Sequence, residues 1–209
     1  MKYKSVFKKF SKLDGSQHIA SEFALKGIET IIRVENIKTI FEFGIGIRTI
    51  PYLIASFDKK YVYTGTESNN FCKNALFKNL EGVIDNQYFN HINDYSEYKG
   101  GKVDFLIVDG SFNDEIFLKK ICHSNTIIMV EGDRSDQRDL ISSTFPNSLY
   151  NFKISLYKNK DFSPFYAKEN NPFVSGYSIF RLNNNFINKL KSFIDKIETS
   201  IRYKLRKII

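Results

Sequence analysis

The stretch IFEFGIGIRT, residues 40–49, decides the fold. An apolar run of strand-favouring residues ends there at an acid and two glycines, and an apolar segment with helix signals follows over 49–57, with Pro51 near its start. Glycine lets the backbone turn sharply and lets a ligand approach closely. A strand, a glycine turn and a helix N-terminus in this order predict a nucleotide-binding corner.

A second acid, Glu67, ends the next predicted strand, YVYTGTE at residues 61–67. Glu67 lies 21 residues after Gly46, close to the ~20 residues expected between a glycine turn and a ribose-binding carboxylate. A carboxylate suits this role because it can accept hydrogen bonds from both ribose hydroxyls.

Strand and helix patterns alternate along most of the chain, which predicts a mostly parallel sheet covered by helices on both faces. The expected strands are 38–43, 61–66, 87–92, 103–108 and 126–130, and then 149–157 and 176–182 without a helix between them. The expected helices are 17–34, 69–79, 113–121 and 135–143, the last with Ser135 as N-cap. The prediction is therefore a single α/β domain, a three-layer sandwich whose seven-stranded sheet ends in an antiparallel hairpin.

The chain divides into three parts by composition. We expect residues 1–37 to form a basic, weakly ordered arm or short helix and a helix that covers the sheet. We expect residues 38–183 to form a ligand-binding α/β domain, and residues 184–209 a basic amphipathic helix. Five lysines and one acid in residues 1–14, and seven basic residues and two acids in 184–209, leave the middle of the chain close to neutral within the net charge of +8.

The pattern over residues 38–182 resembles the class I S-adenosylmethionine-dependent methyltransferases, which have a Rossmann-like fold. The matching features are EFGIG at 42–46, Glu67, the pair Asn93-Asp94, Asp109 at the end of the fourth strand, and the terminal hairpin. The resemblance implies S-adenosyl-L-methionine as cofactor. Its binding residues would be Glu42, Gly44, Gly46, Glu67, Asn93, Asp94 and Asp109.

Within this resemblance Glu67 would bind the ribose, Asn93-Asp94 the adenine, and Asp109 the region of the transferred methyl group. Asp109 would orient the methionine amino group or the acceptor, or it would only cap the following turn. Arg48 stands where the family has a third glycine. This departure disfavours a dinucleotide dehydrogenase, whose third glycine allows close helix–strand packing and a pyrophosphate at the helix N-terminus.

Charged residues also gather at the exit of the fifth strand, over EGDRSDQR at 131–138. Glu131, Asp133 and Arg134 are candidate acceptor-binding residues, and a self-compensating salt-bridge cluster is the alternative. Oxygen ligands at Asp109, Glu131 and Asp133 would suit Mg²⁺, but we predict no metal. His18 opens the covering helix, and histidine is the residue type that most often serves as a general base, so it joins Asp109 as a candidate catalytic residue. His91 and His123 are expected to be structural.

The near-neutral middle of the chain favours a small-molecule or glycan-type acceptor, methylated on oxygen or nitrogen, over nucleic acid. Two alternatives stay open: an RNA methyltransferase whose basic ends grip the phosphate backbone, and a non-catalytic cofactor- or partner-binding protein of the same fold.

The C-terminal segment carries apolar residues at steps of three or four, opposite a basic face. We expect this stripe to dock on the protein's own sheet or on a second subunit, and contact with an anionic membrane is the alternative. Two widely separated cysteines, Cys72 and Cys122, and the absence of a signal-like N-terminus predict a cytoplasmic protein, with peripheral contact to the inner membrane face as an option.

Overall fold

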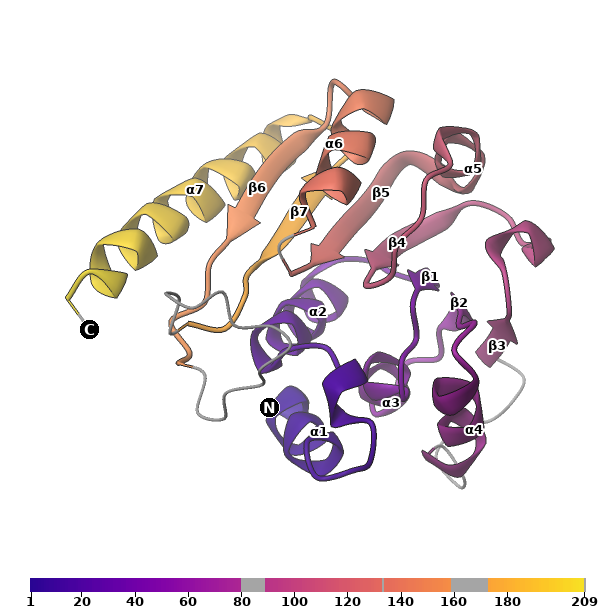
Figure 1. Cartoon of the computed structure of the whole chain (residues 1–209). Coiled ribbons are helices and arrows are strands. Elements are labelled where there is room, and N and C mark those ends of the chain that lie inside the picture. Colours follow the sequence, from indigo (N-terminus) through magenta and orange to yellow (C-terminus); the bar gives the residue numbers. More distant parts are fainter. Residues whose placement is uncertain (80–88, 133, 159–172, 209) are drawn as a thin grey trace.

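The computed structural model describes residues 1–79, 89–132, 134–158 and 173–208. Its strands form one sheet with the order β3-β2-β1-β4-β5-β7-β6 (Figure 1). The strands are β1 (Thr39–Phe43), β2 (Val62–Thr66), β3 (Phe89–Ile92), β4 (Val103–Val108), β5 (Cys122–Glu131), β6 (Leu149–Lys153) and β7 (Tyr177–Arg181). The five strands β1 to β5 are parallel to one another, and β7 runs antiparallel to both β5 and β6. The predicted mostly parallel sheet with a terminal antiparallel hairpin is confirmed.

Helices cover both faces of this sheet (Figure 1). They are α1 (Lys2–Phe10), α2 (Glu22–Val34), α3 (Thr49–Ala55), α4 (Asn70–Asn79), α5 (Glu115–Ile121), α6 (Ser135–Thr144) and α7 (Phe186–Arg206), with short 3₁₀ turns η1 (Ser16–His18) and η2 (Tyr95–Glu97). None of the helices in the described residues is both long enough and apolar enough to cross a bilayer.

Side chains of the central strands point alternately to the two faces of the sheet, and each face has its own hydrophobic core. In β4, Phe105 and Ile107 pack with α1, α2 and α3, whereas Leu106 and Val108 face α5 and α6. Successive side chains of a strand point to opposite faces, so a run of apolar residues buries both sides. The three-layer arrangement follows from these two apolar clusters.

The sheet order reverses direction between β1 and β4, both of which start crossovers from the middle of the sheet. In open α/β sheets the ligand crevice lies at the carboxyl ends of the strands at this point. The predicted glycine corner follows β1 and Asp109 follows β4, so both lie at the switch point.

Several predicted boundaries change. Residues 2–10 form a true helix, because Tyr3, Val6 and Phe10 are buried against the core. The expected helix 17–34 is divided into η1 and α2, and Ser21 caps α2 by accepting a hydrogen bond from the Ala24 amide. Strand β5 starts earlier than expected and β6 ends at Lys153.

The prediction of Ser135 as N-cap of α6 is wrong, since Ser135 is the first helical residue and Arg134 occupies the cap position without a side-chain cap bond. The Arg134 side chain instead points to the crevice, where it binds Asp109.

We expected the apolar stripe of α7 to dock on the protein's own sheet or on a second subunit. Docking on the protein's own sheet is wrong, because the stripe is exposed, and docking on a second subunit stays a prediction. Helix α7 lies against β6, the edge strand (Figure 1). Polar side chains make the contact. Ser192 bonds the Asn151 amide, and the Thr199 hydroxyl donates to the Phe152 carbonyl. The physical reason is that β6 turns polar residues, Asn151 among them, toward the helix, so the polar face of α7 is the complementary one.

Ion pairs reinforce this polar docking. Asp195 bonds Lys153 at 2.7 Å and Arg181 at 2.9 Å, and all three side chains are at most 13% exposed. Lys153 also bonds Glu198. A buried pair of this kind is costly to break because the remaining charge stays in the interior.

We predict that Asp195→Ala destabilises the fold by ~3 kcal/mol, the lower end of the range for a broken buried pair, because Glu198 still reaches Lys153. The neighbouring Ile194 is 55% exposed, so Ile194→Ser should change stability by no more than ~0.5 kcal/mol. Urea denaturation of both variants measures the difference. Equal effects from the two substitutions would contradict polar docking as the main attachment of α7.

Candidate active site

The glycine turn after β1 is held by backbone contacts on two sides. Gly44 has φ of 82° and Gly46 has φ of 56°, values that side-chain-bearing residues rarely adopt. The amides of Gly44 and Ile45 both donate to the Thr66 carbonyl, at 3.1 and 3.0 Å. On the other side, a Cβ on Gly44 would lie 2.9 Å from the Gly110 nitrogen. The turn is therefore fixed between the ends of β2 and β4.

The N-terminal segment crosses the same turn. A Cβ on Gly46 would lie 2.1 Å from the His18 carbonyl oxygen, so only glycine admits this contact. The His18 ring lies 6.2 Å from the Phe71 ring, centroid to centroid. The structure thus brings His18 to the glycine side of the crevice.

Glu67 follows β2 and faces the turn. Its half-buried carboxylate accepts hydrogen bonds from the Gly46 amide and the Asn69 amide, each at 2.8 Å. Each carboxylate oxygen has two acceptor positions, so both oxygens retain capacity for a hydroxyl. Glu67 therefore also shapes the loop, a role that the spacing alone did not indicate.

Glu42 is fully buried at the end of β1. The Tyr63 hydroxyl, from β2, donates to Glu42 Oε2, while Oε1 has no hydrogen-bond partner within the described parts of the chain. Burial raises the pKa of Glu42 well above its ordinary value, and the charges of Asp109 and Glu67 add to this. The role of Tyr63 could not be predicted from the sequence, because nothing in the β2 pattern marks which residue of a neighbouring strand Tyr63 contacts.

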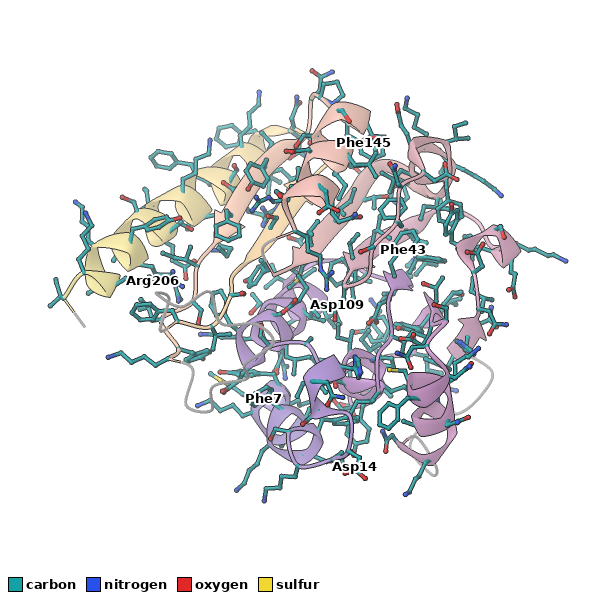
Figure 2. The ribbon with its side chains drawn as sticks, in the orientation of Figure 1. Phe7, Asp14, Phe43, Asp109, Phe145 and Arg206 are labelled. Atoms are coloured by element: carbon teal, nitrogen blue, oxygen red, sulfur yellow. The ribbon has the colours of Figure 1, made fainter. Side chains whose placement is uncertain are left out.

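Asp109 and Arg134 form the other side of the crevice. Arg134 Nη2 lies 3.0 Å from Asp109 Oδ1 and 2.6 Å from the Asp109 carbonyl oxygen, and Arg134 Nε donates to the Glu131 carbonyl. The Asp109 carboxyl is 17% exposed. Figure 2 labels it near the centre of the molecule, where the sheet meets the N-terminal helices. Arg134 therefore clamps the ends of β4 and β5 together.

Burial is the main cause of the raised pKa values of the carboxyl groups at the ends of β4 and β5. Burial raises the pKa of Asp109 most, and the negative charges of Glu131 and Glu67 add to it, against the opposing charge of Arg134. Burial also raises the pKa of Glu131, whose Oε1 accepts a hydrogen bond from the Ser21 amide at 3.3 Å. A cluster of this kind favours a ligand that brings positive charge.

Other predicted site residues have local structural partners. Asp94 caps η2 in a capping box with Glu97, and its hydrogen bonds to Ser96 lower its pKa. Asn93 accepts a hydrogen bond from Lys73 at 3.4 Å. Both follow β3, next to β2, at the same edge of the sheet as Glu67, so their predicted adenine contact stays a prediction.

Asp133 lies outside the described residues. Within the described ranges, no three His, Cys, Asp or Glu side chains gather as metal ligands would. His91 bonds the Glu67 carbonyl and His123 bonds Asp104, both at 3.1 Å.

No family model matches the sequence, and no curated protein is a significant match. Solved structures match over most of the chain. A putative O-methyltransferase from Klebsiella pneumoniae has a TM-score of 0.62 at 10% identity, covering 87% of this chain and 90% of that one. An O-methyltransferase from Bacillus cereus, in complex with S-adenosylhomocysteine, has a TM-score of 0.62 at 10% identity, with coverage of 86% and 90%.

A tRNA (m1A58) methyltransferase from Aquifex aeolicus also matches, with a TM-score of 0.62 at 13% identity and coverage of 86% and 75%. At these identities the likeness shows the fold: this chain has the Rossmann-like fold of the class I S-adenosylmethionine-dependent methyltransferases.

We predict that Gly44→Ala destabilises the protein more than Gly132→Ala. Both glycines have positive φ, 82° and 74°, but a Cβ on Gly132 would meet no atom within 4 Å among the described residues. The Gly132 variant should therefore show only the ~1–2 kcal/mol backbone cost. The Gly44 variant should add an overpacking cost of ~1–3 kcal/mol against Gly110. Thermal or urea unfolding measures the stability of each variant. Equal losses of stability would show that the close approach of Gly44 to Gly110 does not constrain the fold.

Proposed function

We propose that this chain is an S-adenosylmethionine-dependent methyltransferase that methylates an oxygen or nitrogen of a small-molecule or glycan-type acceptor. The observation that carries the proposal is the set of carboxylates from Glu42, Glu67, Asp109 and Glu131 at the carboxyl ends of adjacent strands beside a glycine turn. S-adenosylmethionine has a sulfonium, an ammonium group and a ribose diol, and carboxylates complement all three.

The residues present fit this ligand. Glu67 keeps acceptor capacity for the ribose hydroxyls while it holds the Gly46 amide. Asp109 is partly exposed and is the proposed partner of the methionine amino group. The unpartnered Oε1 of Glu42, among the described residues, supports a polar ligand group or water next to the turn.

S-adenosylmethionine, when bound, would supply a methyl group on its sulfonium sulfur. The oxygen or nitrogen of the acceptor would attack the methyl carbon in line with the carbon–sulfur bond that breaks. The chain's own contribution is to hold the two reactants in this geometry, and positioning alone can supply much of the rate. Asp109, with its raised pKa, is a stronger base than an ordinary carboxylate. His18, next to the glycine turn, stays the second candidate for accepting the proton of the acceptor.

The acceptor would lie on the β4–β5 side of the crevice. Glu131 and Arg134 border it there, and Asp133 belongs to the same segment. Arg134 already bonds Asp109, so its remaining donors are the proposed contact for an anionic group of the acceptor or for the methionine carboxylate. The near-neutral middle of the chain favours a small molecule or glycan over RNA.

The first experiment is calorimetric titration with S-adenosylhomocysteine and, separately, with NAD. We expect S-adenosylhomocysteine to bind and Glu67→Gln to weaken its binding about ten- to a hundredfold, the loss of one charged hydrogen-bond partner. The matched control is Glu115→Gln, an acid on α5 whose side chain is 48% exposed and pairs with Lys119. Binding of NAD alone, or a folded Glu67→Gln protein with unchanged affinity, would overturn the proposed cofactor or the role of Glu67.

A second experiment follows the same affinity from about pH 5 to about pH 8. Because the pKa of Asp109 is raised, a larger part of this carboxyl is neutral at the acidic end. The ionised form is the one that binds an ammonium group, so affinity should increase as the pH rises through this pKa. Asp109→Asn should bind more weakly at about pH 8 and lose most of the pH dependence.

Stability should change in the opposite sense. A carboxyl group whose pKa is raised in the folded state favours folding when it is protonated. This stability is fully present below the pKa of the unfolded state and is lost as the pH rises through the pKa of the folded state. Asparagine removes the loss, so Asp109→Asn should unfold at no lower temperature than the native protein at about pH 8. A variant that keeps the native pH dependence of binding would contradict the role assigned to Asp109.

A further inference from the structure

Helix α7 presents a continuous apolar face to solvent. We define the α7 stripe as Phe186, Leu190, Phe193, Ile197 and Ile201, which are 80%, 51%, 60%, 44% and 53% exposed. Ile187 and Ile194 widen it, at 62% and 55% exposed. Single exposed apolar residues are common, but a contiguous patch of this extent marks an interaction surface.

The stripe is fixed in this orientation. The opposite face of α7 is bonded to the body of the protein through Ser192, Asp195, Glu198, Thr199, Arg202 and Arg206. Near the start of the helix Lys191 bonds Glu35 on the α2 side, at 2.7 Å. Turning the stripe inward would break buried ion pairs, so the apolar face stays outward.

A lysine flank borders the stripe. Helical spacing of about 100° per residue places Lys189, Lys196 and Lys207 together on one side of the stripe. Lys204 lies at the helical angle of Phe186, in line with the stripe at its C-terminal end. Within the described residues, none of these four lysines has an ion-pair partner. The two acids of the helix, Asp195 and Glu198, face inward on Lys153 and other cations.

The lysine flank also borders a surface groove of about 420 Å³ between β6 and α7. Lys196, Lys204 and Lys207 line it together with Tyr203. The outer surface of α7 is therefore apolar along one line and positively charged along the next, with cations beside a concave surface that can receive an anionic group.

This charge arrangement disfavours a second copy of α7 packed antiparallel through the stripe, and it matches an anionic membrane. In an antiparallel two-fold pairing of α7 with a second copy, each flank meets its own counterpart, because a two-fold interface brings the same patch of both subunits together. The lysine flank would then face a lysine flank, and like charges opposite one another are unfavourable. An anionic bilayer offers the complement to both parts: acyl chains for the stripe and phosphates for the lysines.

We propose that α7 lies in the interface of an anionic membrane, with the α7 stripe inserted at the boundary between head groups and acyl chains and the lysine flank on lipid phosphates. The 21-residue helix would lie in the membrane plane over about 30 Å. This surface is distinct from the crevice, so the proposal stands or fails independently of the proposed methyl transfer.

The test is sedimentation of the full chain with phosphatidylcholine vesicles and with vesicles in which about a third of the lipid is phosphatidylglycerol. We expect binding to the anionic vesicles that weakens with salt, and little binding to the neutral ones. Phe193→Gln with Ile197→Gln should abolish sedimentation. Both side chains are exposed, so circular dichroism and melting temperature should stay native.

Lys196→Glu with Lys204→Glu should weaken anionic-vesicle binding about tenfold or more, because each basic residue near an anionic membrane raises the affinity about fivefold. The matched control is Lys99→Glu with Lys120→Glu, two exposed lysines outside α7, which should bind almost as the native chain does.

Three results would overturn the proposal. The first is no vesicle binding by a monomeric native chain. The second is a dimer in analytical ultracentrifugation that the Phe193 and Ile197 substitutions dissociate, which would identify a second copy as the occupant. The third is binding to single-stranded RNA that depends on Lys196 and Lys204 but not on the stripe, without vesicle binding.

Discussion

The close approach of the Gly44 and Gly110 backbones is the constraint on which the site depends. Gly44 leaves no room for a Cβ against Gly110, and the Asp109 amide donates to the Phe43 carbonyl at 2.9 Å. The ends of β1 and β4 are thereby joined at the switch point of the sheet. The glycine turn, the Glu67 loop and the Asp109 carboxyl all take their positions from this junction.

The same junction concentrates negative charge in a partly desolvated space. Burial raises the pKa of both Asp109 and Glu131 by disfavouring their ionised forms, and for Asp109 the charges of Glu131 and Glu67 add to this. The protein offsets part of this cost with Arg134 and the Ser21 amide. A cationic ligand would offset the remainder, which is why the arrangement suits binding better than it suits stability alone.

The sequence predicts features that depend on local pattern, and it fails for those that depend on distant partners. Strands β1, β2, β4 and β5 and their strand-end acids could be predicted because each strand is a run of strand-favouring residues that ends at a carboxylate or a glycine. Glu42 bonds Tyr63, which is 21 positions away in the sequence, and Glu131 bonds Ser21, which is 110 positions away. No periodicity in the chain encodes these contacts.

Helix α7 illustrates a different limit. Its amphipathic pattern correctly predicts a long helix with an apolar stripe, but the pattern cannot say which face packs on the protein. That is decided by Asn151 and Lys153 on the edge strand β6, which bond the polar side. The usual expectation that apolar faces turn inward fails here because the neighbouring strand is itself polar.

The most direct test of the proposed cofactor site is a crystal structure of the chain with S-adenosylhomocysteine. Our account predicts both ribose hydroxyls within hydrogen-bond distance of the Glu67 carboxylate and the amino group beside Asp109. It also predicts the ligand backbone against the turn at Gly44 and Gly46. A ligand bound elsewhere, or a crevice closed by the His18 segment with no ligand at saturating concentration, would contradict it.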